Sequence, residues 1–288
     1  MSNNIFSKTK VWVVISFVSI SLAAVSGYFY FNATSTATIL HSELQKERMS
    51  VIELEGKNSQ LTNELEAEKN RNAVFSGQIQ EIASTVGNLD KLSKTDKELL
   101  QKYSKVYFLN ENYIPDSLSQ VKSDYLYEPS RKMYFHAKAY PFLETMLNAA
   151  KDAGIDLKII SAYRSFEEQT SLKNQYSVTY GSGANKFSAD QGYSEHQLGT
   201  TLDFTTSKTG SNFNAFDKTE SYKWLIENAY KYGFILSYPD GNEYYQYEPW
   251  HWRFVGKALA LRLHEEREVF YELKQSQIDP YLLKIFDN

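Results

Sequence analysis

Apolar and polar positions divide this chain into three parts. An uncharged, mainly apolar run extends from Val11 to Phe31, a seven-residue apolar repeat follows from Leu40 to Leu89, and shorter mixed patterns fill the remainder. A helix through the first run would be about 31 Å long, close to the roughly 30 Å hydrocarbon core of a bilayer. The pattern therefore predicts a transmembrane anchor over 11–31, after a short tail of residues 1–10.

The flanking charges predict the orientation of this anchor. Lys8 and Lys10 lie just before the apolar run, and positive residues favour the cytoplasmic side. We expect the N-terminus in the cytoplasm and everything after Phe31 outside the cell membrane. The alternative is a cleaved signal peptide, but its apolar region would span only about 7–15 residues and would end in a small-residue cleavage site. The length of the run favours the uncleaved anchor.

A heptad pattern follows a polar linker at 32–39. Apolar side chains occupy most of the a and d positions, a pattern typical of a coiled coil. Asn58 at an a position favours a defined register. The alternatives are an amphipathic helix that folds back onto the following domain and a monomeric, partly frayed helix. We predict a coiled-coil stalk over 40–89 and a possible homodimer. The apolar seam comprises Leu40, Leu44, Val51, Leu54, Leu61, Leu65, Phe75, Ile79, Ile82, Val86 and Leu89.

The remaining chain mixes helical and strand patterns. After a connector at 90–103, the domain at 104–288 is predicted to be α+β, with a small antiparallel sheet flanked by helices. Strands are expected at 157–161 and around two segments described below, and a Gly/Ser/Asn-rich loop at 181–192. The predicted helices cover 132–153, 166–176, 221–232 and 256–274.

The composition of the chain limits the partners and metal ligands that are available to it. The chain has 31 Lys and Arg against 35 Asp and Glu, a formal net charge of −4, which argues against nucleic-acid binding. Cysteine is absent, which excludes disulfides and thiolate ligands. Any structural or catalytic zinc must therefore be held by histidine and carboxylate side chains.

Two short segments supply such a ligand set. Ser194–Asp203 carries His196 and Asp203, and Glu248–Arg253 carries His251. Two imidazoles and one carboxylate suit a catalytic Zn²⁺, because three protein ligands leave a fourth position for water. A lone histidine or aspartate on a strand is usually structural, but two segments that complete one ligand set are a stronger signal. Glu248 remains as a fourth group able to take a proton from that water.

Backbone rules place both segments on strands. Gly199 permits a tight turn, and the alternation after it is typical of a strand in which Thr201 and Asp203 share a face. Pro249 makes a helix through Glu248 unfavourable, and the aromatic residues around it favour a strand. The sequence therefore predicts a metal site carried by a sheet.

These segments resemble the VanY-like D-alanyl-D-alanine carboxypeptidases, which are zinc peptidases that trim cell-wall peptides. The likeness lies in Ser-x-His-x-x-Gly-x-x-x-Asp, in Glu-x-Trp-His, in Ser161–Gln169 and in Leu109–Pro115, and it covers about 104–260. Thr201 departs from the family, which usually has alanine there.

The resemblance implies roles for further residues. Arg164 would bind substrate and stabilise the developing oxyanion, and Ser194 would hydrogen-bond the terminal carboxylate of the substrate. Glu195 and Glu243 are the nearest alternatives to Glu248 as acid/base. The other pocket candidates are Tyr163, Gln169, Tyr193 and Trp250, whereas His41, His136 and His264 are interpreted as structural or exposed.

The sequence thus predicts a membrane-anchored carboxypeptidase with one Zn²⁺ per chain that removes a C-terminal D-amino acid, most simply D-alanine, from peptidoglycan stem peptides. The alternatives are a related peptidoglycan endopeptidase and a non-catalytic scaffold that binds the cell wall. A scaffold could lose the ligands or the acid/base glutamate, and this sequence keeps all four groups. The motifs leave open the D,D or L,D preference, the substrate length, and a role in wall maintenance or antibiotic resistance.

Overall fold

The computed structural model describes residues 5–102, 109–180, 190–242 and 244–287. The chain divides into two compact units, residues 1–83 and residues 84–288. The first unit is entirely helical over its described residues, and the second holds all the described strands.

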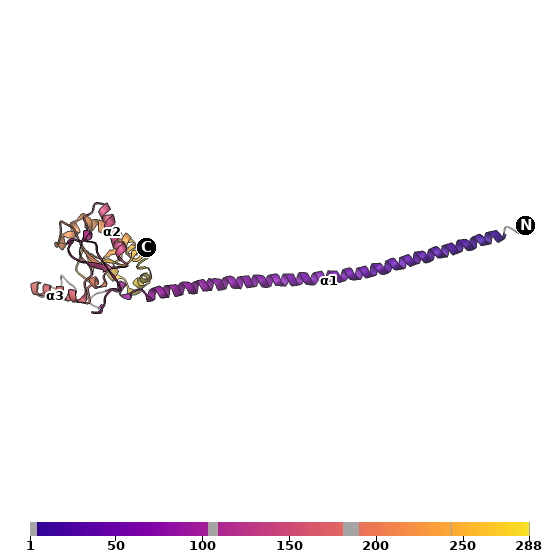
Figure 1. Cartoon of the computed structure of the whole chain (residues 1–288), viewed down its shortest axis with the longest axis horizontal. Coiled ribbons are helices and arrows are strands. Elements are labelled where there is room, and N and C mark those ends of the chain that lie inside the picture. The colour runs from indigo at the N-terminus through magenta and orange to yellow at the C-terminus, as the bar shows by residue number, and fades with distance from the viewer. Residues whose placement is uncertain (1–4, 103–108, 181–189, 243, 288) are drawn as a thin grey trace. The chain divides into compact units, whose positions relative to one another are not determined.

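One continuous helix, α1 (Ile5–Ser93), forms the first unit and enters the second (Figure 1). Near the N-terminus it is long and apolar enough to cross a membrane, a property that a signal sequence shares. The helix also runs through 32–39, where the sequence suggested a linker. The hydroxyls of Thr36 and Thr38 donate to the carbonyls of Asn32 and Thr34, so these polar residues bond within the helix.

A four-stranded antiparallel sheet forms the centre of the second unit. Its order is β3–β4–β6–β5, and a separate antiparallel pair joins β1 to β2. This confirms the predicted mixture of helices with small antiparallel sheets. The strands are β1 (Leu118–Gln120), β2 (Tyr134–His136), β3 (Lys158–Ser161), β4 (Thr201–Thr205), β5 (Phe234–Leu236) and β6 (His251–Phe254).

The helices of the second unit differ from the predicted ranges mainly at their ends. The helix expected at 132–153 begins only at Tyr140, because Tyr134–His136 is strand β2 and Pro141 suits a first helical turn. The one expected at 256–274 ends at Glu266, where Arg267 adopts a left-handed φ of 55°. The α-helices are α2 (Tyr140–Asp152), α3 (Phe166–Tyr180), α4 (Glu220–Asn228), α5 (Lys257–Glu266) and α6 (Gln275–Ile278).

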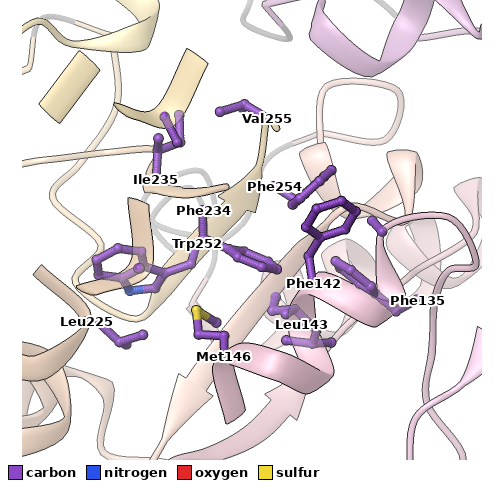
Figure 2. Close-up of a cluster of buried hydrophobic side chains, with 14 of the residues drawn as sticks. Phe135, Phe142, Leu143, Met146, Leu225, Phe234, Ile235, Trp252, Phe254 and Val255 are labelled. Carbon is purple, nitrogen blue, oxygen red and sulfur yellow. The ribbon is translucent and has the colours of Figure 1, made fainter. Parts of the chain in front are cut away.

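The core lies between the sheet and α2 (Figure 2). Phe142 of α2 packs against Phe254 of β6 with ring centroids 5.0 Å apart, and Phe135 stacks on Phe234 at 6.2 Å. Trp252, which alternates with Arg253 along β6, is also buried in this cluster. Burial of these large apolar side chains holds β4 and β6 in place, and those strands carry the site described below.

The second unit includes residues 90–103, the segment that the sequence predicts as a connector. It starts at Ser84, and the 3₁₀ helix η1 (Lys97–Leu100) places Leu99 and Leu100 in the core, each 1% exposed. Asp96 caps η1 by accepting a hydrogen bond from the backbone N–H of Glu98. The segment interpreted as a connector therefore contributes core side chains.

Candidate metal centre

Strand pairing brings together two of the three predicted ligands. In the antiparallel pair β4–β6, Asp203 lies directly opposite His251, and Thr201 lies opposite Arg253. The third residue, His196, lies in the 3₁₀ helix η4 (Glu195–Leu198) just before β4. Gly199 ends η4 with a φ of 71° and turns the chain into β4, and a Cβ there would approach Leu118 and Pro115 at 3.1 Å. The spacing of His196, Gly199 and Asp203 in the sequence follows from this turn.

The three side chains form one buried cluster. His196 Nε2 lies 3.2 Å from Asp203 Oδ2, and His251 Nδ1 lies 3.2 Å from Asp203 Oδ1. One ligand atom from each residue lies within 4.8 Å of the others. Zn–N and Zn–O bonds of about 2.0–2.2 Å place the ligand atoms of one ion about 3–4 Å apart, so the cluster fits a zinc ion.

In each histidine, the ring nitrogen that faces away from Asp203 (the outer nitrogen) also has a hydrogen-bond partner. His196 Nδ1 lies 2.7 Å from the carbonyl of Ala162 and donates to it, because a carbonyl only accepts. His251 Nε2 lies 2.9 Å from Glu195 Oε2. Each ring therefore presents its inner nitrogen to the cluster, as metal-binding histidines do.

Ionisation differs between the two histidines. Burial, with the positive charge of Arg164, lowers the pKa of His196 to about 4, so its Nε2 keeps a free lone pair at neutral pH. Burial also disfavours charge on His251, but hydrogen bonds to Asp203 and Glu195 prevail and raise its pKa to about 10. Binding of zinc at this cluster must therefore displace a proton from His251.

The Asp203 carboxylate is the negative group of the cluster. Burial alone would raise its pKa, but the charges and hydrogen bonds of His196 and then His251 hold the pKa well below its usual range. Asp203 is therefore ionised at neutral pH and ready to act as a ligand.

Glu248 lies at the edge of the cluster. Its Oε2 is 3.6 Å from His251 Nδ1, and its side chain is 22% exposed. Burial is the main cause of a pKa raised to about 7, and the charge of Asp203 adds to it while His251 opposes it. A carboxyl with this pKa can both accept and return a proton near neutral pH.

The two alternative glutamates have different positions. Glu195 is fully buried and contacts the outer nitrogen of His251, away from the atoms that face Asp203 and His196. Glu243 lies outside the described residues. Within the described part of the chain, Glu248 is therefore the better placed of the predicted acid/base candidates.

The predicted substrate residues come from several segments of the second unit, and Arg164 is hydrogen-bonded to η4. The backbone N–H of Arg164 donates to the carbonyl of His196, and the charge of Arg164 affects the pKa values of both His196 and Glu248. Ser194 is the residue before η4 and is buried. Gln169 is buried in the first turn of α3, whereas Tyr163 and Tyr193 are half-buried. Trp250 is half-buried just before β6, and its ring lies 5.0 Å from that of Phe213.

Three residues that contact Glu195 or His251 were not identified from the sequence. Arg253 and Tyr271 both donate to Glu195, and Tyr238 stacks on His251 with ring centroids 4.6 Å apart. The available signal was the period of two along β6, which puts Arg253 on the face of His251. No sequence pattern pointed to Tyr238 or Tyr271.

Comparisons with known proteins identify the family of this chain. The VanY family model, described as D-alanyl-D-alanine carboxypeptidase, matches residues 132–257. "Putative carboxypeptidase YodJ" of Bacillus subtilis is 33% identical over 228 residues, which are 76% of this chain and 83% of that protein. The D-alanyl-D-alanine carboxypeptidase of Enterococcus faecium is 38% identical over 131 residues, 44% of this chain and 39% of that protein.

Two solved structures share the fold. The LdcB LD-carboxypeptidase matches with a TM-score of 0.55 and 36% identity over 60% of this chain and 84% of that one. A vancomycin-resistance D,D-pentapeptidase VanY, solved with Zn(II), matches with a TM-score of 0.51 and 27% identity over 60% of this chain and 97% of that one.

Fold, cluster and relatives together define a peptidase of the zinc carboxypeptidase class. The chain belongs to the VanY family of D-alanyl-D-alanine carboxypeptidases. The prediction of zinc as the cofactor is confirmed, since a VanY relative holds Zn(II) and this chain has a three-residue group that fits the ion.

Proposed function

We propose that this protein is a membrane-anchored zinc carboxypeptidase that removes the C-terminal D-alanine from peptidoglycan stem peptides. The observation that carries the proposal is the buried group His196, Asp203 and His251, within 4.8 Å of one another, with Glu248 at its edge. A related VanY structure was solved in complex with D-alanine-D-alanine, which supports this substrate class.

The roles of the protein groups follow from their ionisation. Zinc held by His196, Asp203 and His251 would supply a Lewis acid for the scissile carbonyl and would acidify a water molecule. Glu248 takes the proton of the attacking water and returns it to the leaving amine. In the metal-free protein burial raises the pKa of Glu248 to about 7, and zinc nearby would favour the carboxylate form that accepts the proton.

Arg164 is proposed to bind the substrate and to stabilise the oxyanion. Its positive charge acts on His196 and Glu248, so it lies close enough to influence charge that develops between them. A guanidinium is always charged and offers a fork of donors suited to carboxylates and oxyanions. Ser194 would bind the terminal carboxylate, and Tyr163, Gln169, Tyr193 and Trp250 would complete the pocket.

The N-terminal unit is proposed to anchor and raise the enzyme. Residues 11–31 would span the membrane with residues 1–10 in the cytoplasm, and residues 40–89 would form a stalk that dimerises as a coiled coil. The seam residues Leu44, Leu54 and Leu61 are exposed in the single chain, as expected of side chains that a second copy would cover. We propose that the catalytic unit includes the connector and begins near Ser84, where the second compact unit starts.

A second candidate is the L,D form of the same reaction. LdcB, an LD-carboxypeptidase, matches this chain with higher identity and TM-score than the D,D-pentapeptidase VanY. The two activities differ in the residue before the scissile bond. An L,D enzyme removes D-alanine from tetrapeptide stems, and a D,D enzyme removes it from pentapeptide stems.

Mass spectrometry of purified stems tests the proposal. The full chain, solubilised in detergent and loaded with zinc, is incubated with tetra- and pentapeptide stems, and Glu248→Gln serves as the matched inactive control. We expect one of the two stems to lose a single C-terminal alanine with wild type only. Cleavage inside the stem would indicate an endopeptidase, and intact stems from zinc-loaded protein would favour the wall-binding scaffold.

A further inference from the structure

Glu195 is a fully buried carboxylate whose two oxygens have separate partners. Oε1 accepts hydrogen bonds from Arg253 Nη1 and from the hydroxyl of Tyr271, each at 2.6 Å. Oε2 lies 2.9 Å from His251 Nε2. The opposite ring nitrogen, Nδ1, faces Asp203 Oδ1 at 3.2 Å. Glu195 thus lies on one side of the His251 ring and the metal cluster on the other.

This arrangement determines where the proton of His251 resides when a metal is bound. Arg253 Nη1 and the hydroxyl of Tyr271 both donate to Oε1, and the buried guanidinium supplies the opposite charge, so Glu195 is held as a carboxylate and its oxygens can only accept. The hydrogen must then reside on Nε2, which leaves the lone pair of Nδ1 directed at the cluster. A neutral imidazole with the other tautomer would point an N–H at the metal.

We propose that Glu195 is a positioning residue that selects the metal-binding tautomer of His251, and that Arg253 and Tyr271 fix its orientation by occupying Oε1. The proposal rests on the proposed zinc site. It assigns Glu195 to the support of a ligand and not to proton transfer with the substrate. Partners of this kind raise the basicity of a ligating histidine and fix its ring.

Arg253 is held in turn by the segment around η1. Its Nη2 donates to the carbonyls of Leu99 and Gln101, each at 2.9 Å, and its guanidinium lies 4.8 Å from the ring centroid of Phe270. Arg253 is fully buried, so it needs these acceptors as well as the opposite charge of Glu195. A chain of hydrogen bonds therefore connects η1, Arg253, Glu195 and the ligand His251.

The variant Glu195→Gln tests the tautomer argument directly. An amide oxygen accepts and an amide nitrogen only donates, so the two donors at Oε1 will hold the glutamine oxygen there. The NH₂ group then faces His251 Nε2 and disfavours hydrogen on that nitrogen. We expect zinc affinity to fall about 10–100-fold in a chelator competition assay, the usual effect of losing such a support. The d–d spectrum of the Co²⁺-loaded protein should change as well.

The matched control is Glu272→Gln, the same change at an exposed position next to Tyr271. It should leave both the zinc Kd and the Co²⁺ spectrum at wild-type values. His196→Ala separates a failure of the proposed metal site from a failure of the role of Glu195. If His196→Ala keeps its zinc, the proposed metal site fails. If His196→Ala loses zinc while a folded Glu195→Gln keeps the wild-type Kd, only the role of Glu195 is overturned.

A measurement on the unaltered protein covers the case in which Glu195→Gln does not fold. The chain has 5 histidines, so ¹⁵N-histidine NMR of the full chain gives a small set of signals. His251 is assigned by comparing the metal-free wild type with metal-free His251→Ala, and its signals are then followed as zinc is added. We expect Nε2 of His251 to carry hydrogen and Nδ1 to show the shift of a metal-bound nitrogen. Hydrogen on Nδ1, or metal on Nε2, would overturn the proposal.

Discussion

Asp203 and His251 lie opposite each other on the adjacent strands β4 and β6, with Oδ1 and Nδ1 3.2 Å apart. Their separation is set by the register of an antiparallel pair, which the buried neighbours Leu202 and Trp252 hold in place. Two of the three proposed metal ligands are therefore brought together by backbone pairing. Only His196, on the turn before β4, depends on a local loop.

This geometry predicts that both histidines are needed for zinc binding. His196→Ala or His251→Ala should abolish stoichiometric zinc and peptidase activity, because two remaining ligands cannot hold a site built for three. Metal analysis of the purified full chain after dialysis checks this. One tightly bound zinc per chain in either variant would show that the ion binds elsewhere. His264→Ala, at an exposed histidine, is the control.

Glu248→Gln should separate catalysis from metal binding. The amide keeps the size of the side chain but cannot take a proton, so kcat should fall by about 10²–10⁴-fold. Zinc content and substrate Kd should stay near wild type, because Glu248 lies at the edge of the cluster. Steady-state kinetics with metal analysis on the same sample makes the comparison. Near-normal turnover, or loss of the metal, would exclude Glu248 as the base.

The raised pKa of Glu248 predicts a pH-dependent cost to stability. The folded metal-free protein holds this proton with a pKa of about 7 against an ordinary value of 4.5. Ionisation therefore opposes folding: the cost is absent below pH 4.5, grows up to pH 7, and is complete above it. Glutamine is neutral throughout, so metal-free Glu248→Gln should be more stable than wild type at pH 8 by at most about 3 kcal/mol.

Urea unfolding of both proteins across this pH range measures the difference. The gap between variant and wild type should be small at low pH and should reach a plateau above neutrality. Zinc should reduce it, because a dication near Glu248 favours the ionised form. A gap that narrows as the pH rises would contradict the sign of the effect.

Truncation should locate the start of the catalytic unit. Removal of residues 1–83 should leave zinc affinity and thermal stability of the second unit close to those of the full chain. Removal of residues 1–103 deletes the buried side chains of Leu99 and Leu100 and the two carbonyls that accept from Arg253. Loss of even one such leucine costs about 2–5 kcal/mol, so this shorter protein should unfold at a lower temperature and bind zinc more weakly. Equal melting temperatures of the two truncated proteins would instead support a catalytic unit that begins at residue 104.

The stalk is expected to associate through its apolar seam. Replacing Leu54 and Leu61 by serine should convert dimers to monomers in sedimentation of the full chain in detergent, because d positions supply the buried knobs of a coiled coil. Serine at Gln60 and Glu66, which lie outside the seam, is the matched control and should leave dimers intact. A wild-type chain that sediments as a monomer at high concentration would remove the dimer from the proposal.

The sequence by itself determined the local features of this protein. The uncharged run 11–31 and the heptads of 40–89 predicted helix there, because helical periodicity is a property of neighbouring residues. Likewise His196, Asp203 and His251 were found from residue type and spacing. Gly199 and the strand period place His196 and Asp203 on either side of one turn, whereas the pairing of β4 with β6 brings His251 to them. The tertiary structure decided what depends on distant contacts. Tyr134–His136 lies within a range whose sequence predicts a helix, but it pairs as β2 with β1, and η1 joins the core although its sequence resembles a connector. The role of Glu195 became visible only when Arg253, Tyr271 and the carbonyl of Leu99 met behind His251, because a buried charge is defined by the partners that folding brings to it.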